Sequence, residues 1–196
     1  MQTPTLNGKR YFITFTNEAS GRVSVCLLSS KDGALTAFHA YRMGVEKASG
    51  YNIKCLWSDG GGEYINKGFR KYLEAAGIKH IVSPSYSPSQ NGRAERMNRT
   101  LMDHVCSMLE DSQLHKEFRG HAVLTAAHIH NHLTSRSNNN TTPLQYWTGK
   151  EPGIGHLRVF GSPAWVHIPK EKRRKLDPKS VECIIVGYEE HAGSRV

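Results

Sequence analysis

Cysteine is scarce in this chain of 196 residues. The four cysteines lie far apart and form no Cys-x-x-Cys pair: Cys26, Cys55, Cys106 and Cys183. Structural zinc sites usually take thiolates from such close pairs, so no zinc is expected on these cysteines. Three of the four lie in apolar runs, which favours buried free thiols in a reducing compartment.

Long apolar runs are also missing. No segment approaches the roughly 20 apolar residues that span a bilayer, and the polar N-terminus shows no signal-peptide pattern. Acidic residues are outnumbered, with 17 Asp and Glu against 26 Lys and Arg, a net charge of +9. This balance favours a polyanionic partner, nucleic acid rather than membrane, and a merely basic soluble protein is the alternative. We expect an intracellular protein, nuclear or cytoplasmic.

Strand and helix patterns alternate over the first 83 residues and predict an α/β fold. The two strands before residue 30 are separated only by Asn17–Gly21, which predicts an antiparallel hairpin. The next two strands are separated by a helix of about a dozen residues, which predicts a parallel βαβ unit. Strands are predicted over Arg10–Phe15, Arg22–Leu28, Ile53–Trp57 and Ile78–Ser83, and helices over about 31–47 and 64–76.

The rest of the chain predicts helices followed by a small β unit. A loop over Ser83–Asn91 is expected to be mobile and to touch substrate. Glu151–Gly153 marks a boundary, which gives a core over 1–150 and a small β extension over 151–196. Helices are predicted from about Asn91, over Glu117–Leu133 and over Pro143–Trp147, and strands over Arg158–Phe160, Ala164–Ile168 and Cys183–Val186.

Two carboxylates stand where metal-dependent phosphoryl transfer would need them. Asp59 follows the apolar run Ile53–Trp57 and precedes three glycines, so we expect it at the carboxyl end of a strand, where open α/β sheets bind ligands. Glu95 lies one step off an apolar helix stripe that recurs every three or four residues from Ala94 to Met108. Two divalent ions about 4 Å apart, held by Asp and Glu, stabilise both reacting oxygens of a phosphodiester. Alone, two such acids are weak evidence.

The segments around these acids resemble the integrases of copia-type retrotransposons. Trp57–Tyr64 reads Trp-Ser-Asp-Gly-Gly-Gly-Glu-Tyr and is similar to their S-D-x-G-G-E-Y segment, and Ser83–Leu101 resembles their P-x-x-P-x-x-N-G-x-A-E-R-x-N-R-T-L segment. Thirty-five residues separate Asp59 from Glu95, as between the last two acids of this integrase group. The tail resembles the region after the integrase core at His156–Gly161, Lys175–Asp177 and Val186–Tyr188.

This resemblance implies a ribonuclease H-like fold and Mg²⁺- or Mn²⁺-dependent DNA integration, with the element's ends and target DNA as partners. Asp59 and Glu95 would be the second and third metal-binding acids of the site. Gln90 and Asn91 would lie in a mobile loop near the DNA end. Arg96 and Arg99 are candidates for phosphate contacts, with a solvated basic helix face as the alternative. The family also implies a homo-oligomer and, in an active element, a virus-like particle.

The tail carries a basic run at Lys172, Arg173, Arg174 and Lys175. Phosphate contact or nuclear import would use such a run, and a solvated loop is the alternative. His128, His130 and His132 form a second notable run. Only His128 and His132 share a helix face, and no third ligand is obvious from the sequence, so surface or packing histidines are favoured over a metal role. Trp57, Trp147 and Trp165 are expected in the core.

The first acid of the family's triad is missing. It would end a strand in a D-x-x-G-P segment upstream of the Tyr11–Phe15 strand, and no Asp precedes Asp32, which sits in a turn. The missing strand would be the central one, between the Tyr11–Phe15 and Ile53–Trp57 strands. We therefore expect a fragment of an integrase core that is inactive by itself. The alternative is a non-catalytic nucleic-acid-binding or inert remnant of a transposable element.

Overall fold

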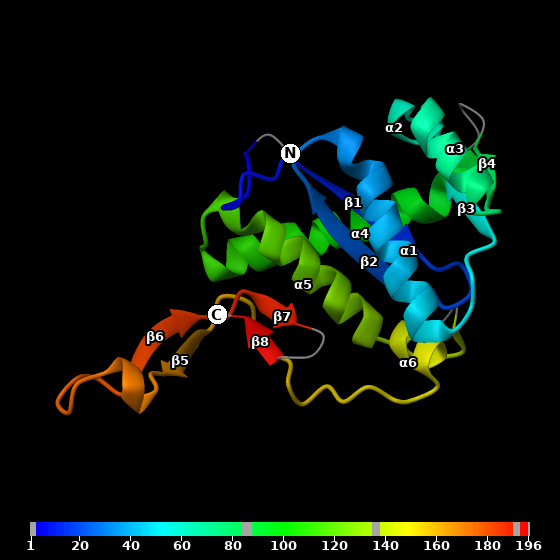
Figure 1. The fold of residues 1–196 in the computed structure, drawn as a ribbon. Coiled ribbons are helices and arrows are strands. Elements are labelled where there is room, and N and C mark those ends of the chain that lie inside the picture. Colours follow the sequence, from blue (N-terminus) through cyan, green and yellow to red (C-terminus); the bar gives the residue numbers. More distant parts are fainter. Residues whose placement is uncertain (1–2, 84–87, 135–137, 190–192, 196) are drawn as a thin grey trace. The chain divides into compact units, whose positions relative to one another are not determined.

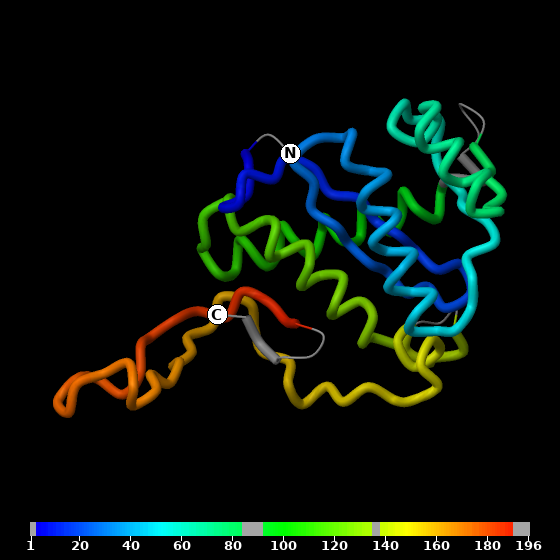
Figure 2. The backbone as a smooth tube through the Cα atoms, viewed as in Figure 1, coloured from blue at the N-terminus to red at the C-terminus, as the bar shows by residue number. Residues whose placement is uncertain are grey.

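The computed structural model describes residues 3–83, 88–134, 138–189 and 193–195, with the backbone alone described at 88–91 and 193–195. The chain forms two compact units, and Figure 2 follows its path. One unit comprises Met1–Thr16 and Ser24–Thr100, and the other comprises Asn17–Val23 and Leu101–Val196. The expected domain boundary near residue 150 stays a prediction. None of the described helices is both long and apolar enough to cross a membrane.

The first unit begins with the predicted hairpin and helix (Figure 1). The Arg10 N–H donates to the Leu28 carbonyl at 3.0 Å, and the Asn17 N–H donates to the Arg22 carbonyl at 2.9 Å, so the first two strands are antiparallel. The long helix ends at Gly50, whose φ of 72° is a left-handed conformation that glycine adopts at little cost. The elements are β1 (Tyr11–Thr16), β2 (Val23–Leu28), η1 (Lys31–Gly33), α1 (Ala34–Ser49), β3 (Cys55–Ser58), α2 (Gly62–Ile65), α3 (Lys67–Ala75) and β4 (Lys79–Val82).

The predicted parallel βαβ unit is present in β3, α3 and β4. The register runs from Cys55 opposite Lys79 to Ser58 opposite Val82. The side chain of Asn66 caps α3 by accepting a hydrogen bond from the Phe69 N–H at 2.8 Å, which satisfies one of the free donors at the helix start. Asp59 follows β3 directly and therefore stands at the carboxyl end of this parallel pair, as expected.

Apolar side chains of β1, α1 and α3 form the core of the first unit. Phe38 of α1 is 1% exposed, and its ring lies 5.7 Å from that of Phe69 and 6.0 Å from that of Phe15. Burial of such rings is the main favourable term in folding a unit of this size. The buried members of the cluster are Ile13, Phe15, Ala34, Ala37, Phe38, Phe69, Leu73 and Ile78.

The strands of this unit belong to two separate sheets. Within the described residues β1 pairs only with β2, and β3 pairs only with β4. One edge of β1 and one edge of β3 thus lack a strand partner. An unpaired edge leaves backbone N–H and C=O groups without their usual partners. This arrangement bears directly on the candidate site.

The second unit contains helices and short antiparallel strands. The predicted helices at 117–133 and 143–147 are present, as is the small β region in the tail. Its strands pair as β5 with β6 and as β7 with β8. The elements are α4 (Pro88–Ser112), which begins in the first unit, η2 (Lys116–Phe118), α5 (Arg119–His132), α6 (Pro143–Thr148), β5 (Pro163–His167), η4 (Lys170–Lys172), β6 (Ser180–Ile184), β7 (Gly187–Glu189) and β8 (Gly193–Arg195).

Two sequence predictions are wrong in this part of the chain. The loop expected over Ser83–Asn91 ends earlier, because α4 begins at Pro88, and residues 84–87 lie outside the described residues. Proline is tolerated in a first helical turn, where its missing N–H would have no helical partner. Arg158–Phe160 is not a strand, and the first tail strand begins at Pro163. Arg158 instead contacts Tyr188, as described below.

Helix α5 is the centre of the second unit's core. Val123 and Ala126 of α5 are 1% and 0% exposed, and the Thr125 hydroxyl donates to the Val186 carbonyl at 3.3 Å, next to β7. The expectation of buried tryptophans is wrong for two of the three. Trp57 is 51% exposed and Trp165 is 64% exposed, whereas Trp147 is half-buried with the Arg22 guanidinium 5.5 Å from its ring centre.

Candidate active site

A cavity of about 260 Å³ lies between the two small sheets of the first unit. One wall is β1 and the opposite wall is β3, and within the described residues each of these strands pairs on one edge only. The first part of α4 completes the lining. The lining residues are Phe12, Ile13, Thr14, Phe15, Leu56, Trp57, Ser58, Asp59, Tyr64, Phe69, Ala94, Glu95 and Asn98. Asp59 and Glu95, which are 36 positions apart in the chain, therefore border one space.

Asp59 is held at the end of β3 by a short turn. Its Oδ1 accepts a hydrogen bond from the Gly61 N–H at 3.2 Å, and the carboxylate is exposed. A side chain on Gly61 would crowd the ends of two neighbouring acidic side chains. A Cβ there would lie 3.0 Å from Oδ1 of Asp59 and 2.9 Å from Oε2 of Glu63. The glycine therefore leaves space at this turn for the ends of the Asp59 and Glu63 side chains.

Glu95 is carried by α4 and is also exposed. Asn98 follows it by three positions, so the two side chains are neighbours on the helix surface. The Asn98 Oδ1 accepts a hydrogen bond from the Thr14 hydroxyl at 2.8 Å, which ties α4 to β1. This bond helps to set the position of α4, and so of Glu95, along β1. The sequence did not single out Asn98, because the bond joins residues 84 positions apart.

Tyr64 and Ser58 shape the surroundings of Asp59. Burial raises the pKa of Tyr64 to about 12, and the charges of Asp59 and Glu63 add to the shift, so the phenol stays neutral. The Ser58 hydroxyl lies 2.9 Å from His80 Nε2 on the neighbouring strand. Burial, followed by the charge of Arg70, lowers the pKa of His80, which keeps the imidazole neutral near pH 7.

The donor set suits a hard divalent cation. Carboxylate and amide oxygens are the ligands that Mg²⁺ and Mn²⁺ prefer, and Mg²⁺ uses few protein carboxylates besides waters and phosphate oxygens. Asp59 and Glu95 supply the carboxylates, and the open cavity between them has room for the remaining ligands. Among the lining residues these two are the acids. Both carboxylates are thus of the chemical type that such an ion binds.

The basic residues predicted to contact DNA differ in how exposed their side chains are. Arg96 and Arg99 are exposed on α4, as are Lys172, Arg174 and Lys175 in the tail. Arg173 is half-buried, and its Nε donates to the Ile168 carbonyl at 3.2 Å, so it holds the turn that carries the others. Gln90 and Asn91 lie in the first turn of α4, and their side chains fall outside the described residues.

Comparisons with known proteins indicate the same class of protein as the sequence motifs do. Residues 1–88 match the family described as integrase core domain, and residues 162–196 match the retroviral polymerase SH3-like domain. The chain is 41% identical over its whole length to the Retrovirus-related Pol polyprotein from transposon TNT 1-94 of Nicotiana tabacum, and it spans 15% of that polyprotein. It is 28% identical to the corresponding polyprotein from transposon RE2 of Arabidopsis thaliana, over 94% of this chain and 12% of that one.

The fold has a solved counterpart. The chain superposes with a TM-score of 0.58 and 19% identity on a chain of the simian T-cell lymphotropic virus intasome in complex with PP2A regulatory subunit B56 gamma, covering 89% of this chain and 61% of that one. An integrase core followed by a retroviral SH3-like region is therefore the class that fold and sequence define. More narrowly, the chain belongs to the integrase region of copia-type retrotransposon Pol polyproteins.

Proposed function

We propose that this chain is the main part of a DNA-integrating catalytic core that uses Asp59 and Glu95 as metal ligands. The observation that carries the proposal is the position of both carboxylates on one cavity, at the end of β3 and on the face of α4. A divalent ion bound there would stabilise the attacking and leaving oxygens of a phosphodiester. Asp59 and Glu95 would supply the carboxylates, and the Thr14–Asn98 hydrogen bond ties α4, which carries Glu95, to β1.

We further propose that a strand supplied by the longer polyprotein fills the space between β1 and β3. Among the described residues each of these strands has one edge without a strand partner, and side chains from both line the cavity. A strand placed there would pair with β1 on one side and β3 on the other, and it would convert two small sheets into one. The family resemblance puts the first acid at the end of such a strand. The chain alone, with two of three acids, would not join DNA.

The DNA partner would contact exposed basic and aromatic side chains. Arg96 and Arg99 lie on the helix that carries Glu95, and they would bind phosphates close to the reacting bond. In the tail, the hairpin of β5 and β6 exposes Trp165, and the neighbouring turn exposes Lys172, Arg174 and Lys175. A basic turn beside an exposed aromatic ring is a common surface for binding nucleic acid.

The deciding experiment measures the joining of a labelled duplex end to plasmid DNA with Mg²⁺ or Mn²⁺. The chain is compared with an extended form that carries an added upstream D-x-x-G-P strand of the kind that the family resemblance implies. Activity is expected only in the extended form, and Asp59→Asn and Glu95→Gln should abolish it. Asp103→Asn is the matched control, because it removes an exposed acid from the same helix as Glu95.

Either unexpected result would be informative. Joining by the chain alone would refute the requirement for a third acid. Inactivity of both forms, with folding verified by circular dichroism, would refute the catalytic proposal and leave the non-catalytic remnant. That remnant is itself testable by the salt dependence of DNA binding. Each lost phosphate contact should lower the slope of log affinity against log salt by about 0.9, so Arg174→Ala should change it, and Lys47→Ala, an exposed lysine on α1, should not.

A further inference from the structure

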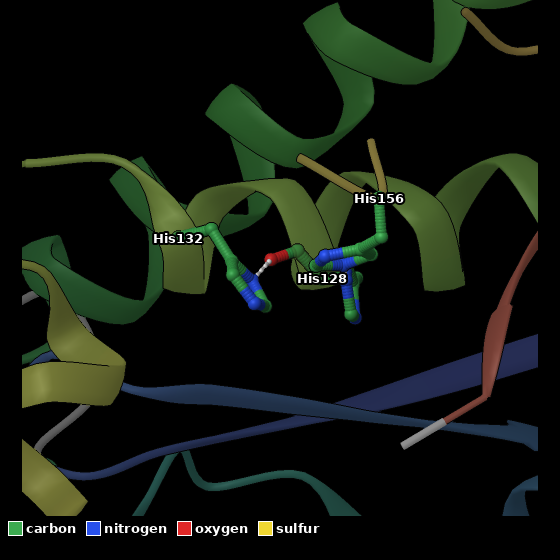
Figure 3. A group of neighbouring side chains, drawn as sticks. All are labelled: His128, His132 and His156. Carbon is green, nitrogen blue, oxygen red and sulfur yellow. Dashed lines mark hydrogen bonds between the residues drawn. The ribbon is translucent and has the colours of Figure 1, made fainter. Parts of the chain in front are cut away.

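Three histidines from two separate segments meet in the second unit (Figure 3). His128 and His132 lie four residues apart on α5, and His156 comes from the irregular segment that precedes the tail strands. One nitrogen from each ring lies within 4.8 Å of the others. An i, i+4 pair of histidines on a helix joined by a third from another segment is a common arrangement of metal ligands. His156 is the third ligand that the sequence did not reveal.

The nitrogen spacing matches what a small metal ion requires. His128 Nε2 and His156 Nε2 are 3.1 Å apart. Two nitrogens bound at about 2.05 Å to a tetrahedral ion lie about 3.3 Å apart. Without an ion, two imidazole nitrogens at this distance need a proton between them. With an ion, both nitrogens donate lone pairs to it, and the protons reside on the other ring nitrogens.

The tautomer of His132 is already set for binding. Its Nδ1 lies 2.8 Å from the carbonyl oxygen of His128, as the dashed line in Figure 3 shows. A carbonyl oxygen only accepts, so Nδ1 carries a proton, and Nε2 is the nitrogen with a lone pair in the neutral ring. Metal-binding histidines usually donate their second ring N–H to a carbonyl or carboxylate in this way. His132 is buried, so this orientation is also fixed by packing.

Tyr188 holds the third histidine in place. Its ring stacks on His128 at 4.5 Å and meets His156 edge-on at 5.6 Å. The Tyr188 hydroxyl accepts from the Arg158 N–H at 2.8 Å and donates to the Arg158 carbonyl at 2.7 Å. These two bonds fix the backbone two residues after His156. Because His156 is exposed and His132 is buried, an ion bound here would keep one side open to water.

The three side chains also indicate which metal would bind. Three imidazoles select borderline ions such as Zn²⁺ over the hard Mg²⁺ that the carboxylate site would take. The two sites would thus not compete for the same metal.

We propose that His128, His132 and His156 form a binding site for one Zn²⁺ ion, with a fourth position open to water. The ion would join α5 to the segment that leads into the SH3-like region, so its role would be structural. The scarcity of paired cysteines argued against a thiolate zinc site, and this site uses imidazoles instead. It is independent of the proposed integrase activity, since none of its ligands lines the Asp59–Glu95 cavity.

The test uses the full chain, purified without a histidine tag and stripped with a chelator. Zn²⁺ is titrated in competition with a chromophoric chelator, and Co²⁺ is added separately to record its visible absorption. We expect one tight Zn²⁺ per chain, a higher melting temperature on binding, and a Co²⁺ spectrum typical of a four-coordinate ion with three nitrogen ligands and one water. His156→Ala should weaken Zn²⁺ binding by at least about 10-fold. Loss of a residue that only hydrogen-bonds to a metal ligand already weakens metal binding by about that factor.

His115→Ala is the matched control, because its side chain is 72% exposed and lies outside the cluster. It should leave the affinity and the thermal shift unchanged. His156 is exposed, so its substitution should not unfold the chain, and circular dichroism checks this. Equal affinity in the wild type, His156→Ala and His115→Ala would overturn the proposal, as would absence of stoichiometric binding. His128→Ala removes a different ligand, the one on α5, and serves as a second test.

Discussion

The side-chain amide of Asn131 forms two hydrogen bonds with the backbone of Val23. Its Oδ1 accepts from the Val23 N–H and its Nδ2 donates to the Val23 carbonyl, each at 2.8 Å. The amide therefore acts as one residue of a strand would, and it satisfies both backbone groups at the start of β2. Val23 is 2% exposed, so water cannot replace these partners.

Asn131→Ala should lower the free energy of unfolding by about 1–3 kcal/mol, because it leaves a buried N–H and a buried C=O without partners. Urea denaturation followed by tryptophan fluorescence measures the change. Asn52→Ala, at an exposed asparagine, is the control and should change stability by less than about 0.5 kcal/mol. Equal effects of the two substitutions would show that the Val23 contacts contribute nothing.

The loss of folding stability at acidic pH should depend in part on Glu46. The Ile53 N–H, followed by the Arg42 guanidinium, lowers the pKa of this carboxyl below its ordinary value. The charged form is thus favoured in the folded chain, and its contribution is complete at neutral pH and lost as the pH falls through the lowered pKa. Glu46→Gln should be less stable than wild type at pH 7, and the difference should shrink at pH 3. A difference that does not change with pH would contradict this account.

Gly61→Ala should disturb the candidate active site with little effect on folding. The added Cβ would push away the ends of the Asp59 and Glu63 side chains, which are flexible and exposed to different degrees. We expect weaker Mn²⁺ binding and lower joining activity in the extended chain, at nearly unchanged melting temperature. Gly60→Ala is the control, because a Cβ there meets nothing within 4 Å. If both variants retain full Mn²⁺ affinity, the carboxylates at this turn do not hold the metal.

Gly161→Ala should destabilise the second unit strongly. Its φ of +80° costs an L residue about 1–2 kcal/mol, and its Cβ would also collide with the side chain of Ser112. Gly149 has a similar φ of +72°, and a Cβ there would meet nothing within 4 Å, so Gly149→Ala isolates the backbone cost. The difference between the two variants in chemical denaturation should be about 1–3 kcal/mol, the range for overpacking. Equal destabilisation would show that the Ser112 contact relaxes freely.

Much of the fold could be predicted because periodicity reports which face of an element is buried. The hairpin, α1, the parallel pair of β3 and β4, and α5 all follow from such patterns. Trp57 and Trp165 show the limit of that reasoning, since an apolar side chain is buried only if another element covers it. The start of α4 was missed because Pro88 was interpreted as a loop residue, although proline fits the first helical turn.

The candidate site could be predicted only in part, for a similar reason. Asp59 and Glu95 were found through the motifs that surround them, and the fold places both on one cavity. Asn98 and His156 were not found, because their partners are 84 and 28 positions away in the chain. Contacts across such separations depend on how elements pack, and a local pattern contains no signal for them.

The separation of β1 from β3 has a consequence for handling this protein. Two strand edges that face a common gap will accept backbone from any extended segment that reaches them, including one from another copy of the same chain. If the proposed strand lies between β1 and β3, a chain expressed without it would be exposed to mispairing between copies as its concentration rises. Supplying the strand in the same polypeptide would protect the sheet by occupying both edges before a foreign segment can.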